Sequence, residues 1–174
     1  LFLDGETAFD KISHSGLHSA LERLGVDPLY INMIAAICAF PQFKVRSAGT
    51  ESSIYNASSG IGQGCPLSPY LFLILMTVMF HDIHKDGVLQ RELEEDRILG
   101  TIFNEFLYAD DTICVSTDTR AMNKLLKSIE AESAKYGLTL NKTKCELVTN
   151  TPNLKISGFA VSLKKRRGRR GRSG

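Results

Sequence analysis

The 174-residue chain has little cysteine and no long apolar run, and each shortage excludes a class of protein. Its four cysteines are widely spaced and form no C-x-x-C pair, which argues against a disulfide framework or a zinc site. We therefore expect free thiols in a reducing, intracellular compartment. The longest apolar run, Leu67 to Phe80, is interrupted by Ser68 and Pro69 and falls short of the ~20 residues that span a membrane. It predicts a buried helix and no membrane partner.

The overall composition is that of a soluble globular domain, with 43% hydrophobic residues and 23% charged residues. The length suits one domain with a core of its own, since domains of about 100–150 residues are the commonest. No internal repeat and no signal peptide are visible. Because the chain begins at Leu1, without Met and inside an apolar segment, we expect it to be part of a longer protein.

The net charge of +2 conceals an uneven distribution of basic residues. The run from Lys164 to Arg172 holds seven of the 21 basic residues and no acid, so residues 1–163 hold 14 basic and 19 acidic residues. We expect a folded domain over 1–161 and a disordered basic tail over 162–174. The tail is either a nucleic-acid-binding or nuclear-import segment or a solvated run without function, and the sequence leaves both readings open.

The stretch Phe106 to Val115 holds two adjacent acids, Asp110 and Asp111, among residue types that favour strands. It predicts two strands joined by a tight connection at Ala109-Asp110. Neighbouring carboxylates repel each other and are tolerated most easily beside a divalent cation, and carboxylate oxygens with phosphate are the usual ligands of Mg²⁺. The alternative is a polar hairpin turn with solvated aspartates.

Two other stretches favour the metal interpretation. The chain opens with an apolar run that ends at Asp4. The second stretch is 60–69, where three glycines at alternate positions allow another backbone or a base to approach closely. Ser68-Pro69 then supplies a capping hydroxyl and a proline at the first helical position, which together predict a helix start.

Taken in order, these stretches resemble the reverse transcriptases of non-LTR retrotransposons. The resemblance rests on D-x-x-x-A-F-D at Asp4 to Asp10, Q-G-C-P-L-S-P at Gln63 to Pro69, Y-A-D-D at Tyr108 to Asp111, and G-L-x-x-N-x-x-K at Gly137 to Lys144. It implies an α+β polymerase palm, a small antiparallel sheet packed on helices, with a fragment of the fingers and without the thumb. It also implies that the strand at Asp4 lies beside the Asp110 hairpin.

The resemblance further implies a two-metal nucleotidyl transfer. A dNMP moves from a dNTP to a primer 3′-hydroxyl, with two Mg²⁺ ions (Mn²⁺ as a substitute) about 3.5–4 Å apart. The implied metal ligands and catalytic residues are Asp4, Asp110 and Asp111. Lys144 matches the lysine that protonates the departing pyrophosphate. The alternative for Lys144 is an ordinary exposed lysine.

The same resemblance implies a set of residues that bind the incoming nucleotide and the template. They are Ala8, Phe9, Gln63, Gly64 and Tyr108. Phe9 lies under the sugar and excludes a 2′-hydroxyl, the group that distinguishes ribonucleotides. The alternatives are a core position for Phe9 and a loop-capping role for Gln63.

Three departures from the family pattern leave two functions open. Gly5, Thr7 and Gly62 stand where an apolar residue, a basic residue and an arginine are usual. One reading is an RNA-directed DNA polymerase domain whose partners are an RNA template, a DNA primer, a dNTP and the rest of a parent polyprotein, and which is inactive as an isolated fragment. The other is a catalytically inactive retroelement remnant that at most binds RNA. A eukaryotic retroelement would act in the nucleus.

Local patterns predict the secondary structure. Helices are expected at 15–24, 28–39, 69–81 and 120–136, and strands at 43–46, 54–57, on both sides of 109–110, at 146–148 and at 155–161.

Overall fold

The computed structural model describes residues 1–5, 7–39, 42–56, 59–62, 64–87, 89, 91, 105–108, 111–149 and 156. Its elements are β1 (Phe2–Leu3), α1 (Ala8–Lys11), α2 (His14–Arg23), α3 (Pro28–Ala39), β2 (Gln42–Phe43), β3 (Arg46–Ser47), β4 (Thr50–Glu51), β5 (Tyr55–Asn56), α4 (Ser68–His84), β6 (Glu105–Tyr108), β7 (Asp111–Cys114) and α6 (Thr119–Lys135). The four long helices predicted from the sequence are present within a few residues of their expected ends. The short helix α1 was not predicted.

Local capping residues explain where the helices begin and end. Ser13 caps α2, because its hydroxyl oxygen accepts the backbone N–H of Gly16 at 3.3 Å. Asp118 caps α6 in the same way. Pro69 lies in the first turn of α4, where a missing N–H costs nothing. After α2, Gly25 adopts a left-handed conformation with φ of 72°. Glycine adopts this conformation readily, whereas other residues rarely adopt it.

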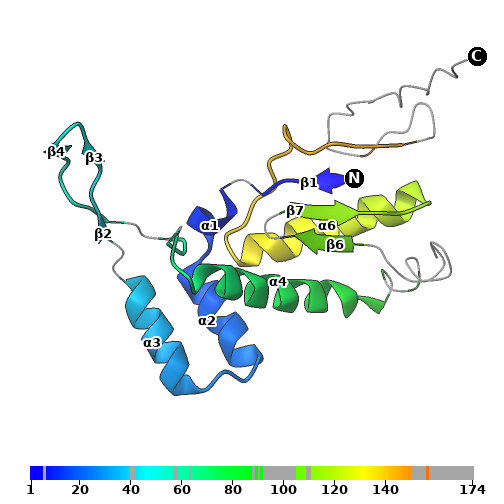
Figure 1. Cartoon of the computed structure of the whole chain (residues 1–174). Helices are drawn as coiled ribbons and strands as arrows, with labels where there is room; N and C mark the ends of the chain where they lie inside the picture. Colours follow the sequence, from blue (N-terminus) through cyan, green and yellow to red (C-terminus); the bar gives the residue numbers. More distant parts are fainter. Residues whose placement is uncertain are drawn as a thin grey trace, which may run out of the picture.

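The main sheet has the strand order β1-β7-β6, and both pairs are antiparallel (Figure 1). Tyr108 pairs with Asp111, so two residues connect β6 and β7, as the sequence predicted. Leu3 pairs with Thr112, which confirms that the strand before Asp4 lies beside this hairpin. Residues 109 and 110 themselves lie outside the described residues.

Helices α4 and α6 pack against each other and against one face of the sheet. Side chains of all three meet at a small interior cavity of about 40 Å³, where Leu3 of β1 faces Met76 of α4 and Ile129 of α6. Leu75 of α4 and Leu125 of α6 are fully buried. Burial of their apolar side chains, rather than helix propensity alone, stabilises these two long helices.

A polar cluster joins α2 to α4 and to the residue after α6. The guanidinium of Arg23 donates two hydrogen bonds to the carboxylate of Asp82, at 2.6 and 2.5 Å, and a third to the hydroxyl of Tyr136 at 3.2 Å. Hydrogen bonding from Arg23 lowers the pKa of Asp82 below its ordinary value. Arg23 therefore links α2, α4 and the residue after α6 at one point.

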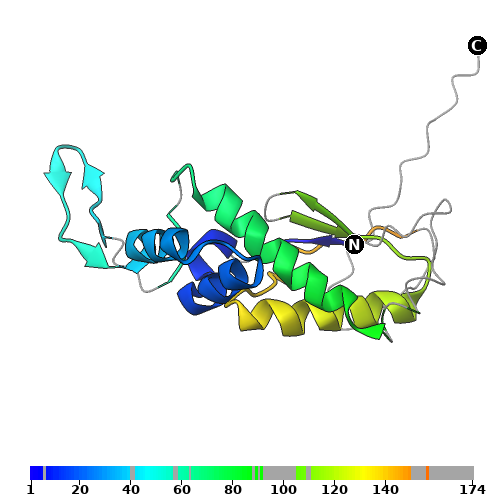
Figure 2. The same cartoon turned by 90° about the horizontal axis from the view of Figure 1, so that it is seen from below.

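The remaining elements, α3 and two small hairpins, project away from the sheet (Figures 1 and 2). Strand β2 pairs with β5, and β3 pairs with β4 across the turn at Ala48-Gly49. The predicted strands at 43–46 and 54–57 are thus parts of one longer hairpin. Among the described elements, helix α3 packs chiefly against α2.

The remaining expectations concern the C-terminal segment, the cysteines and the membrane. The predicted strand at 146–148 is reduced to a single bridge between Glu146 and Phe2. The predicted strand at 155–161 and the basic tail lie outside the described residues, except for the buried Ile156. All four cysteines are free thiols, and burial raises the pKa of Cys114 to about 12. None of the described helices is both long and apolar enough to cross a membrane.

Candidate active site

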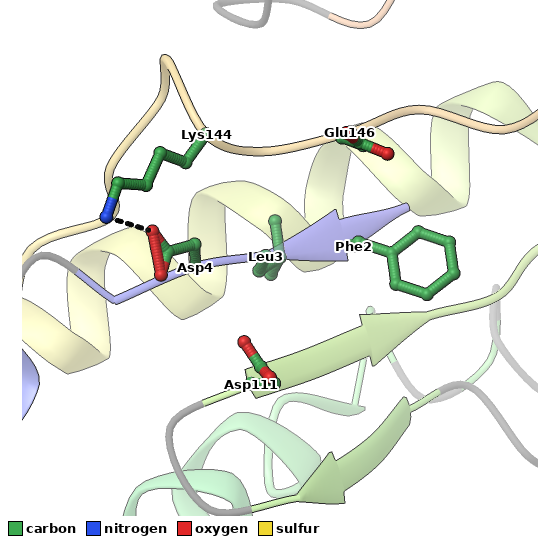
Figure 3. A pocket seen from close by; sticks show the side chains of 6 residues that line it. All are labelled: Phe2, Leu3, Asp4, Asp111, Lys144 and Glu146. Atoms are coloured by element: carbon green, nitrogen blue, oxygen red, sulfur yellow. Dashed lines mark ion pairs between the residues drawn. The ribbon is translucent and has the colours of Figure 1, made fainter. Parts of the chain in front are cut away.

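The register of β1 against β7 brings Asp4 and Asp111 to facing positions. Leu3 pairs with Thr112, so one residue further along each strand places Asp4 opposite Asp111. Side chains alternate between the two faces of a strand, and both carboxylates therefore lie on the sheet face that α4 and α6 leave open. Figure 3 shows the two carboxylates on adjacent strands of one pocket.

The segment 137–146 runs along the other edge of β1 and carries Lys144 to the same place. The N–H of Asn141 donates to the carbonyl of Asp4 at 2.8 Å, and the backbones of Phe2 and Glu146 exchange two hydrogen bonds. Between these anchors the chain makes a turn in which the N–H of Lys144 donates to the carbonyl of Asn141. As a result, Lys144 Nζ lies 3.6 Å from Asp4 Oδ2.

These side chains line an open pocket of about 330 Å³. Its lining residues are Phe2, Leu3, Asp4, Asp111, Lys144 and Glu146. Three of the four catalytic residues predicted from the sequence are therefore together. The fourth, Asp110, lies outside the described residues.

The electrostatics of the pocket fit a bound cation. Asp4 Oδ2 is shielded from solvent and accepts no hydrogen bond from any described residue. A buried carboxylate oxygen without a donor is unfavourable unless a positive charge compensates it. Asp4 and Asp111 together offer the hard oxygen ligands that a divalent cation prefers. Two carboxylates are an incomplete ligand set, and no cluster of three metal-ligating side chains occurs within the described ranges.

The glycine-rich loop docks on α1, the short helix that follows Asp4. Gly60 has φ of 88°, and a Cβ on it would lie 2.7 Å from the Cα of Asp10, so only glycine fits there. The N–H of Ile61 donates to the carbonyl of Phe9 at 2.8 Å, and the Gly60 carbonyl accepts a hydrogen bond from His14 Nε2. His14 thus holds the loop in place.

Of the candidate nucleotide-binding residues, the described Ala8, Phe9 and Gly64 do not line the carboxylate pocket. The ring of Phe9 is half-buried and stacks on Phe72 of α4, with centroids 4.9 Å apart. Ala8 is buried beside the interior cavity. Gly64 has φ of 86°, and the space that its Cβ would take is open. Gln63 and the side chain of Tyr108 lie outside the described residues.

Residues 1–161 match the sequence model of one family, described as reverse transcriptase (RNA-dependent DNA polymerase). The chain belongs to the reverse transcriptase family. This confirms the family that the ordered motifs indicated. Members of the family use divalent metal ions and bind nucleic acid templates, which agrees with the open carboxylate pocket.

Relatives with similar sequences come from mobile elements. The RNA-directed DNA polymerase from mobile element jockey of Drosophila funebris is 26% identical over 167 residues, covering 92% of this chain and 18% of the relative. The Pol polyprotein of a type-1 retrotransposable element R2 from Nasonia vitripennis is 26% identical over 165 residues, covering 94% of this chain and 15% of the relative. The reverse transcriptase chain therefore spans less than a fifth of these relatives.

Solved structures with a similar fold include two telomerases. Apo telomerase from Candida tropicalis matches with a TM-score of 0.57 at 18% identity, covering 80% of this chain and 28% of that one. Telomerase from Candida albicans, solved with a fragment of telomeric RNA, matches with a TM-score of 0.56 at 18% identity, covering 81% and 26%. These likenesses support the expected palm fold.

The motifs of the sequence did not include Glu146, which lines the pocket. Asn141 belongs to the G-L-x-x-N-x-x-K motif; it does not line the pocket, but its backbone connects the Lys144 turn to Asp4. Glu146 lies two residues after Lys144, which is the spacing of one strand face, and that was a usable signal. The Asn141 backbone contact leaves no signal in the sequence, because any residue but proline can donate it.

Proposed function

We propose that the chain is the nucleotidyl-transfer part of an RNA-directed DNA polymerase. It transfers a dNMP from a dNTP to the 3′-hydroxyl of a DNA primer on an RNA or DNA template, with the remainder of a parent polyprotein completing the enzyme. The observation that carries this proposal is the facing pair Asp4 and Asp111 in an open pocket, with Lys144 beside them. Two carboxylates and a lysine on an open sheet face suit a phosphate-bearing substrate.

The three aspartates would hold two Mg²⁺ ions, with Mn²⁺ as a substitute. Asp4 and Asp111 would contribute from adjacent strands, and Asp110 from the connection between β6 and β7. Such ions would supply activation of the primer hydroxyl and offset the charge of the triphosphate. Lys144 donates a proton to the departing pyrophosphate as a general acid.

Ala8, Phe9, Gln63, Gly64 and Tyr108 bind the nucleotide and the template. Phe9 selects the sugar, because its ring takes the volume that a 2′-hydroxyl would need. The stacking of Phe9 on Phe72 supports this role, since it restrains the ring in one orientation. Gly64 admits a close approach of the substrate to the backbone, as the open space above its Cα allows.

Primer extension by the full-length parent enzyme tests the metal assignment. Asp4→Asn should reduce extension at least about a hundredfold, as expected when a group that stabilises the transition state is lost. RNA binding should stay nearly unchanged. Glu22→Gln is the matched control, because Glu22 is an exposed carboxylate of α2 that faces His18.

Full activity of Asp4→Asn in Mg²⁺ would contradict the metal assignment. A wild-type parent that binds RNA and extends no primer would instead establish the alternative, an inactive retroelement remnant.

Sugar selection is tested separately with Phe9→Val in the same parent. The ratio of kcat/KM for a matched dNTP and rNTP should fall by about 10- to 200-fold, the range that one pocket contact supplies. An unchanged ratio would make Phe9 a core residue only.

A further inference from the structure

The ion pair between Lys144 and Asp4 is placed where a metal ion would bind. Asp4 Oδ2 accepts no hydrogen bond from the described residues, and the cationic group that faces it is Lys144 Nζ at 3.6 Å. Asp111 lies on the adjacent strand, so the pocket concentrates negative charge around this oxygen. The ammonium group is the positive charge that offsets it within the described residues of the pocket.

The backbone delivers Lys144 to Asp4 and directs its neighbour Lys142 elsewhere. The turn at 141–144 is attached to the Asp4 carbonyl through the Asn141 N–H, and the Thr143 hydroxyl donates to the Asn141 side chain at 2.7 Å. Lys142, two residues earlier, forms an ion pair with Glu130 of α6 at 2.6 Å. The two lysines therefore have different carboxylate partners.

We infer that Lys144 is the counter-cation of Asp4 in the metal-free site and leaves Asp4 when a divalent cation binds. A metal ion on Oδ2 and an ammonium group at the present distance would repel each other, so the two compete for one carboxylate. Lys144 stabilises the site without metal, and a bound metal ion must displace it. The apparent metal affinity is therefore lowered by the factor by which Lys144 stabilises the site without metal. Its release would free the side chain for the triphosphate at the moment the metal arrives.

This inference rests on the proposed function, since it takes Asp4 as a metal ligand. The test is a Mn²⁺ titration of the 174-residue chain, with free Mn²⁺ measured by electron paramagnetic resonance. The Lys144 side chain is 70% exposed, so solvent screens the pair, and the expected change is moderate. Lys144→Met should bind Mn²⁺ about three- to tenfold more tightly than the wild type.

Three variants serve as controls. Lys144→Arg keeps the positive charge and should bind Mn²⁺ like the wild type. Lys142→Met removes a nearby lysine that pairs with Glu130 and should also match the wild type. Asp4→Asn should lose the binding, and circular dichroism should show that each variant is folded.

The outcomes distinguish the counter-cation role of Lys144 from the proposed metal site at Asp4. If Asp4→Asn loses Mn²⁺ while Lys144→Met binds it no more tightly than the wild type, the counter-cation role is wrong and the metal site stands. Equal tightening by Lys142→Met would also overturn it, because the effect would then be one of overall charge. If Asp4→Asn binds Mn²⁺ as the wild type does, the proposed metal site itself is wrong.

Discussion

The palm elements and the projecting elements of this chain bury their apolar residues very differently. In α4 and α6 the apolar side chains face the sheet and each other, and Leu75 and Leu125 are fully buried. Helix α3 has no charged residue, yet Leu29 and Ile37 are each more than half exposed. Ile31 of α3 is buried in the core, but most of its other large apolar side chains are exposed and contribute little burial to this fold.

The polar interactions follow the same division. In the palm, Arg23 connects α2, α4 and the residue after α6. In the projecting hairpin, Arg46 and Lys44 both pair with Glu51, within a few residues along the chain. Long-range contacts therefore stabilise the half that holds Asp4 and Asp111, and local contacts stabilise the other. Changes in α3 and the hairpins should leave the pocket in place.

The largest expected difference between the two halves is in the unfolding free energy lost when an apolar side chain is truncated. Leu75→Ala should lower the free energy of unfolding by about 2–5 kcal/mol, because it removes buried methyl groups and leaves a cavity. Leu29→Ala on exposed α3 should change it by less than about 0.5 kcal/mol. Urea denaturation followed by circular dichroism measures both values, and similar losses would contradict the division.

Two left-handed glycines provide the next comparison. Gly137 has φ of 79°, and a Cβ on it would lie 2.5 Å from the carbonyl oxygen of Lys11, whereas Gly25 has φ of 72° and open space. Gly137→Ala should cost about 2–4 kcal/mol from backbone strain plus steric overlap. Gly25→Ala should cost about 1–2 kcal/mol from strain alone. Equal losses of unfolding free energy would mean that the Lys11 carbonyl moves aside for the new methyl group without destabilising the fold.

The two arginines should differ by a smaller amount. Arg23→Ala should lower the unfolding free energy by about 1 kcal/mol, since the paired groups are partly exposed, and Arg46→Ala by less than about 0.5 kcal/mol. The Arg23 pair lowers the pKa of Asp82, so its contribution is present above the ordinary value of 3.8 and is lost as pH falls through the lower folded value. Denaturation at pH 6 and pH 2.5 should show the Arg23→Ala difference shrinking in acid.

The smallest expected effect concerns His84, near the end of α4. Its Nε2 lies 2.5 Å from Glu105 Oε1 of β6, and this hydrogen bond raises the pKa of His84 above the ordinary 6.5. The contribution is fully present below 6.5 and is lost as pH rises through the folded value. His84→Gln should therefore cost at most about 1 kcal/mol at pH 5.5 and less at pH 9. Glu105→Gln should remove the same pH dependence, and a His84→Gln loss that is constant with pH would contradict the pairing.

The sequence by itself determined the local elements and the family. Pro69 marked the start of α4 correctly, because a proline in the first helical turn depends on local backbone geometry alone. The capping role expected of Ser68 was wrong, since its hydroxyl donates to the Gly62 carbonyl and caps no N–H of the helix. The hairpin at 109–110 was predicted because residue types that favour strands flank it closely. The strand at 146–148 was overpredicted, since its backbone meets β1 at one bridge only.

Only the tertiary structure decided which residues share a pocket. Asp4 and Asp111 are far apart in the chain and become neighbours through the register of β1 on β7, which the packing of the sheet on α4 and α6 holds in place. By residue type alone Lys142 and Lys144 are alike, and only the family resemblance singled out Lys144. The turn anchored by Asn141 directs Lys144 to Asp4 and leaves Lys142 with Glu130, because side-chain direction depends on a backbone contact that residue identity does not encode.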